Sequence, residues 1–356
     1  MIGEIKGKSI KIRNNIDCII SIMENSQSIT VENCKNCSIL LAPCSSSILV
    51  DNCENLNLIC ASLNIKVTNI KKGYLYIFSI NSIVIENSEE IFLGNFFFQY
   101  TELPDMFLNS KLNIWNNKWS CYEEKGSNKN INYSNDLIKQ KIIDQFKPVI
   151  NNCYINIDQY QFLPFIYGKS IYNINNGEKE NIFINFMIII RQEDFQENEI
   201  LKILLPEELE NYHMKLISTL TLEENNDKIN NLIKKLELNK DTSDIINYIL
   251  RTNSRDELLE SKQNSELKSS ANKSRLNEID LSNNDYICNN YKFLKDRDLL
   301  FLWFVNCTEN FKEIYYYFNN FFEPINVYII KKETFGWSED EFKKYLNRFF
   351  EFEKSE

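Results

Sequence analysis

Alternating apolar and polar positions recur along the first hundred residues of the chain. Five seven-residue segments share a pattern in which the second and fourth positions are Ile or Val, while the first, third and fifth are mostly polar. The segments are residues 9–15, 28–34, 47–53, 64–70 and 82–88. Such alternation predicts a strand with one buried face.

Each segment carries an Asn at its sixth position, the non-Gly residue that best tolerates the left-handed conformation of a tight corner. These corner residues are Asn14, Asn33, Asn52, Asn69 and Asn87. A second apolar run follows most corners, at 37–41, 56–60 and 74–78. Repeats of about 18 residues with short strands and a fixed corner predict a parallel β-helix, here of five coils.

Two other coiled folds have a similar repeat. A left-handed hexapeptide helix needs an apolar residue every six positions and many small residues, which this chain lacks. A pectate-lyase-like coil stays open, but its calcium chemistry needs clustered carboxylates. The outward acids here, Glu32, Asp51 and Glu86, are single and spread along the fifth position.

The rest of the chain predicts a closing segment at 95–120, a polar loop at 122–133 and a short amphipathic helix at 137–146. Strand, helix and strand patterns follow at 182–190, 197–205 and 214–220, and recur at 299–305, 309–322 and 325–330. Two such units predict a ferredoxin-like (split βαβ) sheet. The fold class is therefore mainly β plus α/β, with domains at 1–133 and 181–356 joined by a linker at 134–180.

Polar, charged sequence at about 223–296 cannot bury a core and predicts a disordered insertion, with short helices near 228–238 and 243–251. A final helix begins at Ser338, with Glu341 as its capping-box partner, and extends to Phe352.

The charge and the apolar content of the chain argue against some classes of function. A net charge of −10 argues against nucleic acid as a partner, and the longest apolar stretches are far below the roughly 20 residues that span a bilayer. We expect a cytoplasmic protein with reduced thiols. Cys34 and Cys37 have CxxC spacing without a second pair, so stacked thiols are favoured over a zinc or redox site. The single histidine, His213, is favoured as a surface or packing residue.

An ordered run of short stretches resembles the C-CAP domain family of tubulin-binding cofactor C, and within it the retinitis pigmentosa 2 protein branch. The stretches are ENCKNC at 32–37, LAP at 41–43, DNCEN at 51–55, IVIEN at 83–87, LGNF at 93–96 and IWNNKWS at 114–120. The resemblance implies a right-handed β-helix that binds ARF-like small GTPases, or tubulin in the cofactor C branch. It also implies a nucleoside-diphosphate-kinase-like C-terminal domain, which we expect to be a scaffold because His213 stands outside any matching motif.

The family's arginine finger for GTPase activation falls on Lys66, and its accompanying glutamine falls on Asn64. Lysine supplies a point charge without the planar fork of arginine, so the resemblance implies weak or absent activation and no catalysis by the chain itself. No cofactor is expected, because the partner GTPase would carry GTP and Mg²⁺.

A contact surface is predicted beside this position. Leu49 and Val84 occupy the same outward position as Lys66 on the neighbouring coils, and Glu86 retains the family's acidic contact position. The predicted partner is an ARF-like GTPase in its GTP state, with tubulin as the alternative. The family's Met-Gly-Cys acylation signal is absent from Met1-Ile2-Gly3, which argues against membrane attachment through it. A ciliary or flagellar base and membrane surfaces are further locations that the resemblance implies.

Overall fold

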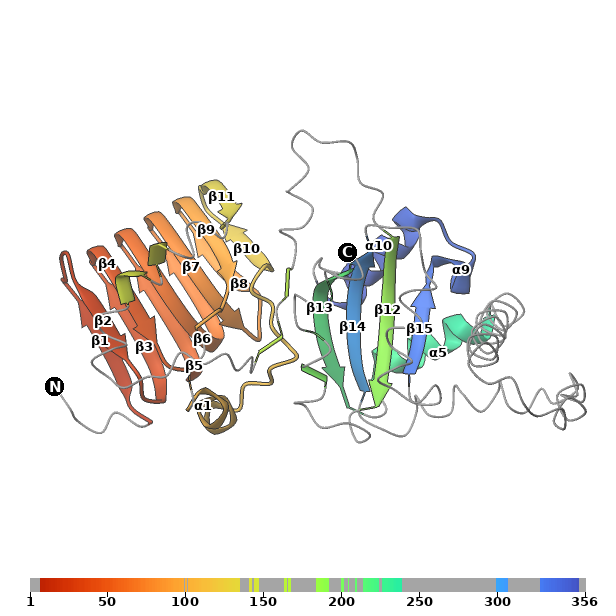
Figure 1. The fold of residues 1–356 in the computed structure, drawn as a ribbon. Helices are drawn as coiled ribbons and strands as arrows, with labels where there is room; N and C mark the ends of the chain where they lie inside the picture. Colours follow the sequence, from red (N-terminus) through yellow and green to blue (C-terminus); the bar gives the residue numbers. More distant parts are fainter. Residues whose placement is uncertain are drawn as a thin grey trace, which may run out of the picture. The chain divides into compact units, whose positions relative to one another are not determined.

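The computed structural model contains two compact units, one built on an N-terminal solenoid and one on a C-terminal sheet (Figure 1). The structure describes residues 7–98, 100, 102–134, 141, 142, 144–146, 163, 164, 166, 167, 184–191, 200, 201, 204, 209, 214–223, 226–238, 299–306 and 327–351.

Parallel strands stack coil upon coil in the N-terminal unit, which is a β-solenoid (Figure 1). Its strands are β1 (Ser9–Arg13), β2 (Ile19–Ile22), β3 (Ser26–Glu32), β4 (Lys35–Leu41), β5 (Cys44–Asp51), β6 (Glu54–Thr68), β7 (Lys71–Ser79), β8 (Ile83–Glu86), β9 (Glu89–Asn95), β10 (Tyr122–Lys125) and β11 (Lys129–Tyr133). The Ile and Val residues at the second and fourth repeat positions fill the interior, as alternation predicted.

Two walls form from these strands. One wall stacks β1, β3, β5, the second half of β6, β8 and β10, and the other stacks β2, β4, the first half of β6, β7, β9 and β11. β6 belongs to both because it runs through a bend between them. We call the outer surface of the first wall the open face and that of the second wall the covered face.

The solenoid has a sixth coil, so the predictions of five coils and of a polar loop at 122–133 were wrong. β10 pairs in parallel with β8, and β11 pairs with β9. The pattern was hidden because Tyr122 and Glu124 stand where other coils have Ile or Val. Gly126, with φ +67°, takes the corner position, and a Cβ there would lie 2.2 Å from the Asn87 side-chain oxygen.

The corner prediction is confirmed, because all five predicted asparagines have φ between 47° and 57°. A second left-handed residue follows three positions later in each of these coils, namely Asp17, Asn36, Asn55, Lys72 and Glu90. Amide ladders link the coils here: Asn52 Nδ2 donates to Asn33 Oδ1 at 2.6 Å, and Asn55 Nδ2 donates to Asn36 Oδ1 at 3.0 Å. Each of these corners thus turns the chain through two left-handed residues, and where these are asparagines their amides link neighbouring coils.

Large apolar side chains point outward from the middle of the covered face and are shielded from solvent. Leu40, Ile59 and Tyr76 are 1, 0 and 2% exposed. Gln145, in a short helical segment, accepts hydrogen bonds from Ser38 Oγ at 2.7 Å and Asn57 Nδ2 at 3.1 Å, which fixes this segment across the wall (Figure 1).

Further chain segments pack against the solenoid. The Tyr76 hydroxyl shares a hydrogen bond with Ser134 Oγ, and the buried Phe146 packs on Phe98. Helix α1 (Leu103–Ser110), which the sequence analysis missed, is tied to the solenoid by Asn25, whose Nδ2 donates to Met106 O at 2.9 Å.

The C-terminal sheet has the strand order β13-β14-β12-β15. Its strands are β12 (Ile184–Arg191), β13 (Met214–Leu222), β14 (Leu299–Asn306) and β15 (Val327–Lys331), and β12 runs antiparallel to both β14 and β15. Predicted strands thus occur where expected. The ferredoxin-like assignment stays a prediction, because the two helices that it requires, at 197–205 and 309–322, lie largely outside the described residues.

Helices of the same unit are α5 (Asp227–Leu238), α9 (Lys332–Phe335) and α10 (Glu339–Phe349). The capping box of Ser338 and Glu341 is confirmed, with Ser338 N donating to Glu341 Oε2 at 2.8 Å, although α10 ends before Phe352. The short helix predicted near 228–238 is confirmed as α5, which buries Ile229, Leu232 and Ile233. The rest of the predicted insertion, the right-handedness of the solenoid and the domain boundaries stay predictions.

Candidate functional site

The open face presents two outward rows that run along the solenoid axis. The third-position row contains Lys11, Thr30, Leu49, Lys66, Val84 and Glu123. The fifth-position row contains Arg13, Glu32, Asp51, Thr68, Glu86 and Lys125. Every one of these side chains is exposed or half-buried, in contrast to the covered face. Within the solenoid, both rows therefore keep part of their side-chain surface open to solvent.

The predicted contact residues meet in the middle of this face. Lys66 on β6 is the register neighbour of Leu49 on β5 and of Val84 on β8. Neighbouring strands lie about 4.8 Å apart, so the three side chains form one continuous strip. Leu49 and Val84 are half-buried, which leaves apolar surface on both sides of the lysine.

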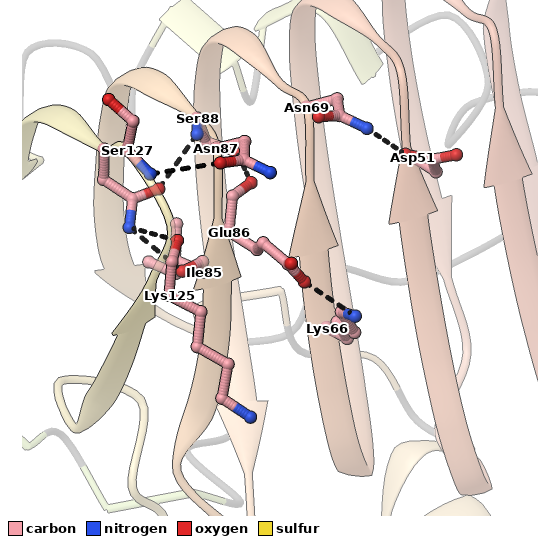
Figure 2. A network of polar contacts seen from close by, with 10 residues as sticks. Asp51, Lys66, Asn69, Ile85, Glu86, Asn87, Ser88, Lys125 and Ser127 are labelled. Atoms are coloured by element: carbon pink, nitrogen blue, oxygen red, sulfur yellow. Dashed lines mark hydrogen bonds and ion pairs between the residues drawn. The ribbon is translucent and has the colours of Figure 1, made fainter.

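Lys66 does not stand free on this strip. Its Nζ forms an ion pair with Glu86 Oε2 at 2.8 Å, as Figure 2 shows, and the two side chains are 48 and 30% exposed. The hydrogen bond and charge of Lys66 hold the pKa of Glu86 below its ordinary value, with a weaker contribution from Lys125. The amine at the predicted finger position and the predicted acidic contact are thus each other's partners.

Asn64, the other residue of the predicted finger element, belongs to a separate network. Its Nδ2 donates to Ser46 O at 3.3 Å, and its Oδ1 accepts from Asn81 Nδ2 at 2.8 Å. Asn64 is therefore held by the neighbouring coils, and the structure gives it no hydrogen bond to Lys66 among the described residues.

A separate row of charged residues lies just past the corners, and its charges alternate in sign from one coil to the next. Lys35, Glu54, Lys71, Glu89 and Lys129 lie in register on successive coils, so their charges alternate. Lys35 Nζ lies 2.9 Å from Glu54 Oε2, and Lys71 Nζ lies 3.9 Å from Glu89 Oε1. We call this row the alternating ladder. Sequence analysis missed it, although the charges at 35, 54, 71 and 89 follow the repeat spacing.

Cys34 and Cys37, the residues with CxxC spacing, both lie within the solenoid. Cys34, Cys37 and Cys53 are free thiols and buried, and burial raises the pKa of Cys37 and raises that of Cys53 to about 12. In the part of the chain that the structure describes, no group of three or more His, Cys, Asp or Glu residues could hold a metal ion. His213 lies outside the described residues.

The sixth coil adds residues that sequence analysis did not assign to the face. β10 places Glu123 beside Val84 and Lys125 beside Glu86. The sequence feature that could have indicated the sixth coil is the short polar stretch before Gly126. It has the length of a strand but lacks the apolar positions of the other coils.

No helix among the described residues combines the length and apolarity needed to cross a bilayer. A search of curated proteins finds no match to the chain. A family comparison matches residues 7–123 to Tubulin binding cofactor C, a segment that covers the first five coils and enters β10. With the parallel solenoid and its asparagine corners, this match places residues 7–123 in the tubulin binding cofactor C domain family.

Proposed function

We propose that the open face binds an ARF-like small GTPase in its GTP state, and that the protein is an effector or a weak activator of that GTPase. The observation that carries the proposal is the strip formed by Leu49, Lys66 and Val84, with Glu86 paired to the lysine. Half-buried aliphatic side chains flanked by charge on a rigid sheet have the chemistry of a protein contact surface.

The chemistry at position 66 favours weak activation. An arginine finger stabilises charge that develops on phosphoryl oxygens, and its planar fork can form two parallel hydrogen bonds. Lys66 has one compact charge, and Glu86 already neutralises it in the free protein. The nucleotide and Mg²⁺ belong to the partner in this proposal, and the chain contributes only the lysine.

The binding test is titration of the full chain against GTP-loaded and GDP-loaded partner. We expect tighter binding to the GTP state, and weaker binding of that state by the variant Glu86→Lys. Lys71→Glu, a charge reversal in the alternating ladder, is the matched control and should bind as the unmodified protein does. Equal affinity for both nucleotide states would contradict the proposal.

The activation test is single-turnover hydrolysis of GTP by the partner. Lys66→Ala should remove any stimulation while most of the binding remains, because a finger acts mainly in the transition state. Lys66→Arg should raise the rate, by roughly one to two orders of magnitude if the fork reaches the phosphate. No gain with Lys66→Arg, at unchanged affinity, would identify an effector.

A second candidate function has its own support. The matched family takes its name from tubulin binding, so the same face is a candidate surface for tubulin or for assembly of the cytoskeleton. Capture assays with purified tubulin and GTP-loaded partner side by side distinguish the two. Cytoplasmic, ciliary or membrane-peripheral location stays a prediction.

A further inference from the structure

Two acidic residues lie side by side on the open face, although its two rows together hold four acidic and four basic residues. Glu32 on β3 and Asp51 on β5 are register neighbours in the fifth-position row, so two carboxylates stand about one strand spacing apart. Like charges directly opposite each other on neighbouring strands destabilise a sheet. Among the described residues, neither carboxylate forms an ion pair within the protein, although Arg13 follows next to Glu32.

The alternating ladder, by contrast, places charges of opposite sign on neighbouring coils. Its five residues alternate in sign over five coils, with two ion pairs formed. The ladder and the fifth-position row flank the same corner and follow the same repeat. The adjacent carboxylates of Glu32 and Asp51 are therefore a property of the open face and not of the repeat.

A shielded hydroxyl continues the same row. Thr68 lies in register between Asp51 and Glu86, and its Oγ1 is buried without a hydrogen-bond partner among the described residues. Asp51 itself accepts one hydrogen bond from Asn69 Nδ2 at 3.0 Å, which holds its carboxylate in place (Figure 2). Acceptor capacity within reach of a partner is thus left over at Glu32 and Asp51, beside the aliphatic side chain of Leu49.

We infer that the partner's footprint extends from Glu86 toward β3, and that the partner places a Lys or Arg side chain against Glu32 and Asp51. This inference rests on the proposed function and specifies the chemistry of the GTPase surface: a cation beside an apolar side chain. In the direction of β10, Lys125 already contributes a cation next to Glu86, whereas the register neighbours of Asp51 are Glu32 and Thr68. The footprint is therefore asymmetric along the solenoid axis.

The test uses the full chain carrying both Glu32→Gln and Asp51→Asn, titrated against the GTP-loaded ARF-like GTPase. Both replacements keep a side-chain oxygen, so the bond from Asn69 can persist. We expect about three- to tenfold weaker binding, chiefly through slower association, since rim charges act mostly on the association rate. The difference from the unmodified protein should shrink between about 50 and 300 mM salt, because salt screens exposed charges.

Two further measurements make the result specific. The thermal midpoint of the double variant should stay the same or rise, because a like-charge contact is removed. Glu54→Gln, which removes one charge from the alternating ladder, should lower the midpoint and leave binding unchanged. Unchanged binding by the double variant, with normal binding by the unmodified protein, overturns this inference alone. No binding by the unmodified protein overturns the proposed function and this inference together.

Discussion

The two outer faces of the solenoid come from one repeat but have opposite environments. On the covered face, Leu40, Ile59 and Tyr76 are shielded by segments from outside the repeat. On the open face, Leu49 and Val84 are left half-buried. The difference teaches that availability to a partner is decided by chain outside the coils. The coils themselves offer outward aliphatic residues on both walls.

Truncating Phe146, in the segment that packs on the covered face, should give the largest effect on stability. Phe146 is fully buried and packs on Phe98, and truncating a buried Phe to Ala typically costs about 3–5 kcal/mol. We expect Phe146→Ala to destabilise the solenoid by an amount in this range, measured by urea unfolding. Leu49→Ala on the open face is the control, and its cost should be much smaller because Leu49 is only half-buried. Equal losses would contradict the distinction between the faces.

Much of this comparison could be predicted from sequence. Period-two alternation identifies the inward residues, and the repeat spacing places Leu49, Lys66 and Val84 on adjacent coils, since both are properties of a rigid stack. The cover could not be predicted, because Gln145 meets Ser38 over a separation of more than a hundred residues. Nor could the sixth coil, whose inward positions carry Tyr122 and Glu124.

The ion pair between Lys66 and Glu86 shows a similar limit of prediction from sequence. The repeat predicts that Lys66 and Glu86 are near each other, but not that the lysine amine bends toward the glutamate. That choice depends on neighbouring charge and on the side-chain conformations, which alternation does not encode. Sequence therefore locates the surface better than it describes the state of its central residue.

The corner that joins the two faces should give an intermediate effect. Asn52 has φ +50°, and its amide donates to Asn33 at 2.6 Å. Ala in this conformation costs roughly 1–2 kcal/mol because its Cβ crowds the following carbonyl, whereas Gly adopts it freely. We expect Asn52→Ala to lower the free energy of unfolding by about this amount, and Asn52→Gly to lower it less. An equal loss with both variants would mean that the amide ladder, which both remove, and not the backbone holds the corner.

The smallest expected effect concerns acid titration on the two sides of that corner. Glu86 and Glu54 each have a pKa lowered from 4.5, chiefly by hydrogen bonds from Lys66 and Lys35 respectively. A carboxyl whose pKa is lower in the folded protein than in the unfolded chain stabilises the fold at pH values above its unfolded-state pKa. That contribution is lost as the pH falls through the folded-state pKa. Stability should therefore decline as pH drops below about 4.5, with a contribution from both sides of the corner.

Lys66→Met separates the two pairs. We expect it to return the pKa of Glu86 toward 4.5, measured by NMR titration of the side-chain carboxyl, and to leave Glu54 unchanged. The acid-dependent loss of stability should then shrink only by the share that Glu86 contributes, because the ladder pair of Lys35 and Glu54 is intact. A shift of both carboxyls would show that the open face and the ladder respond as one electrostatic unit, and the contrast between them would fail.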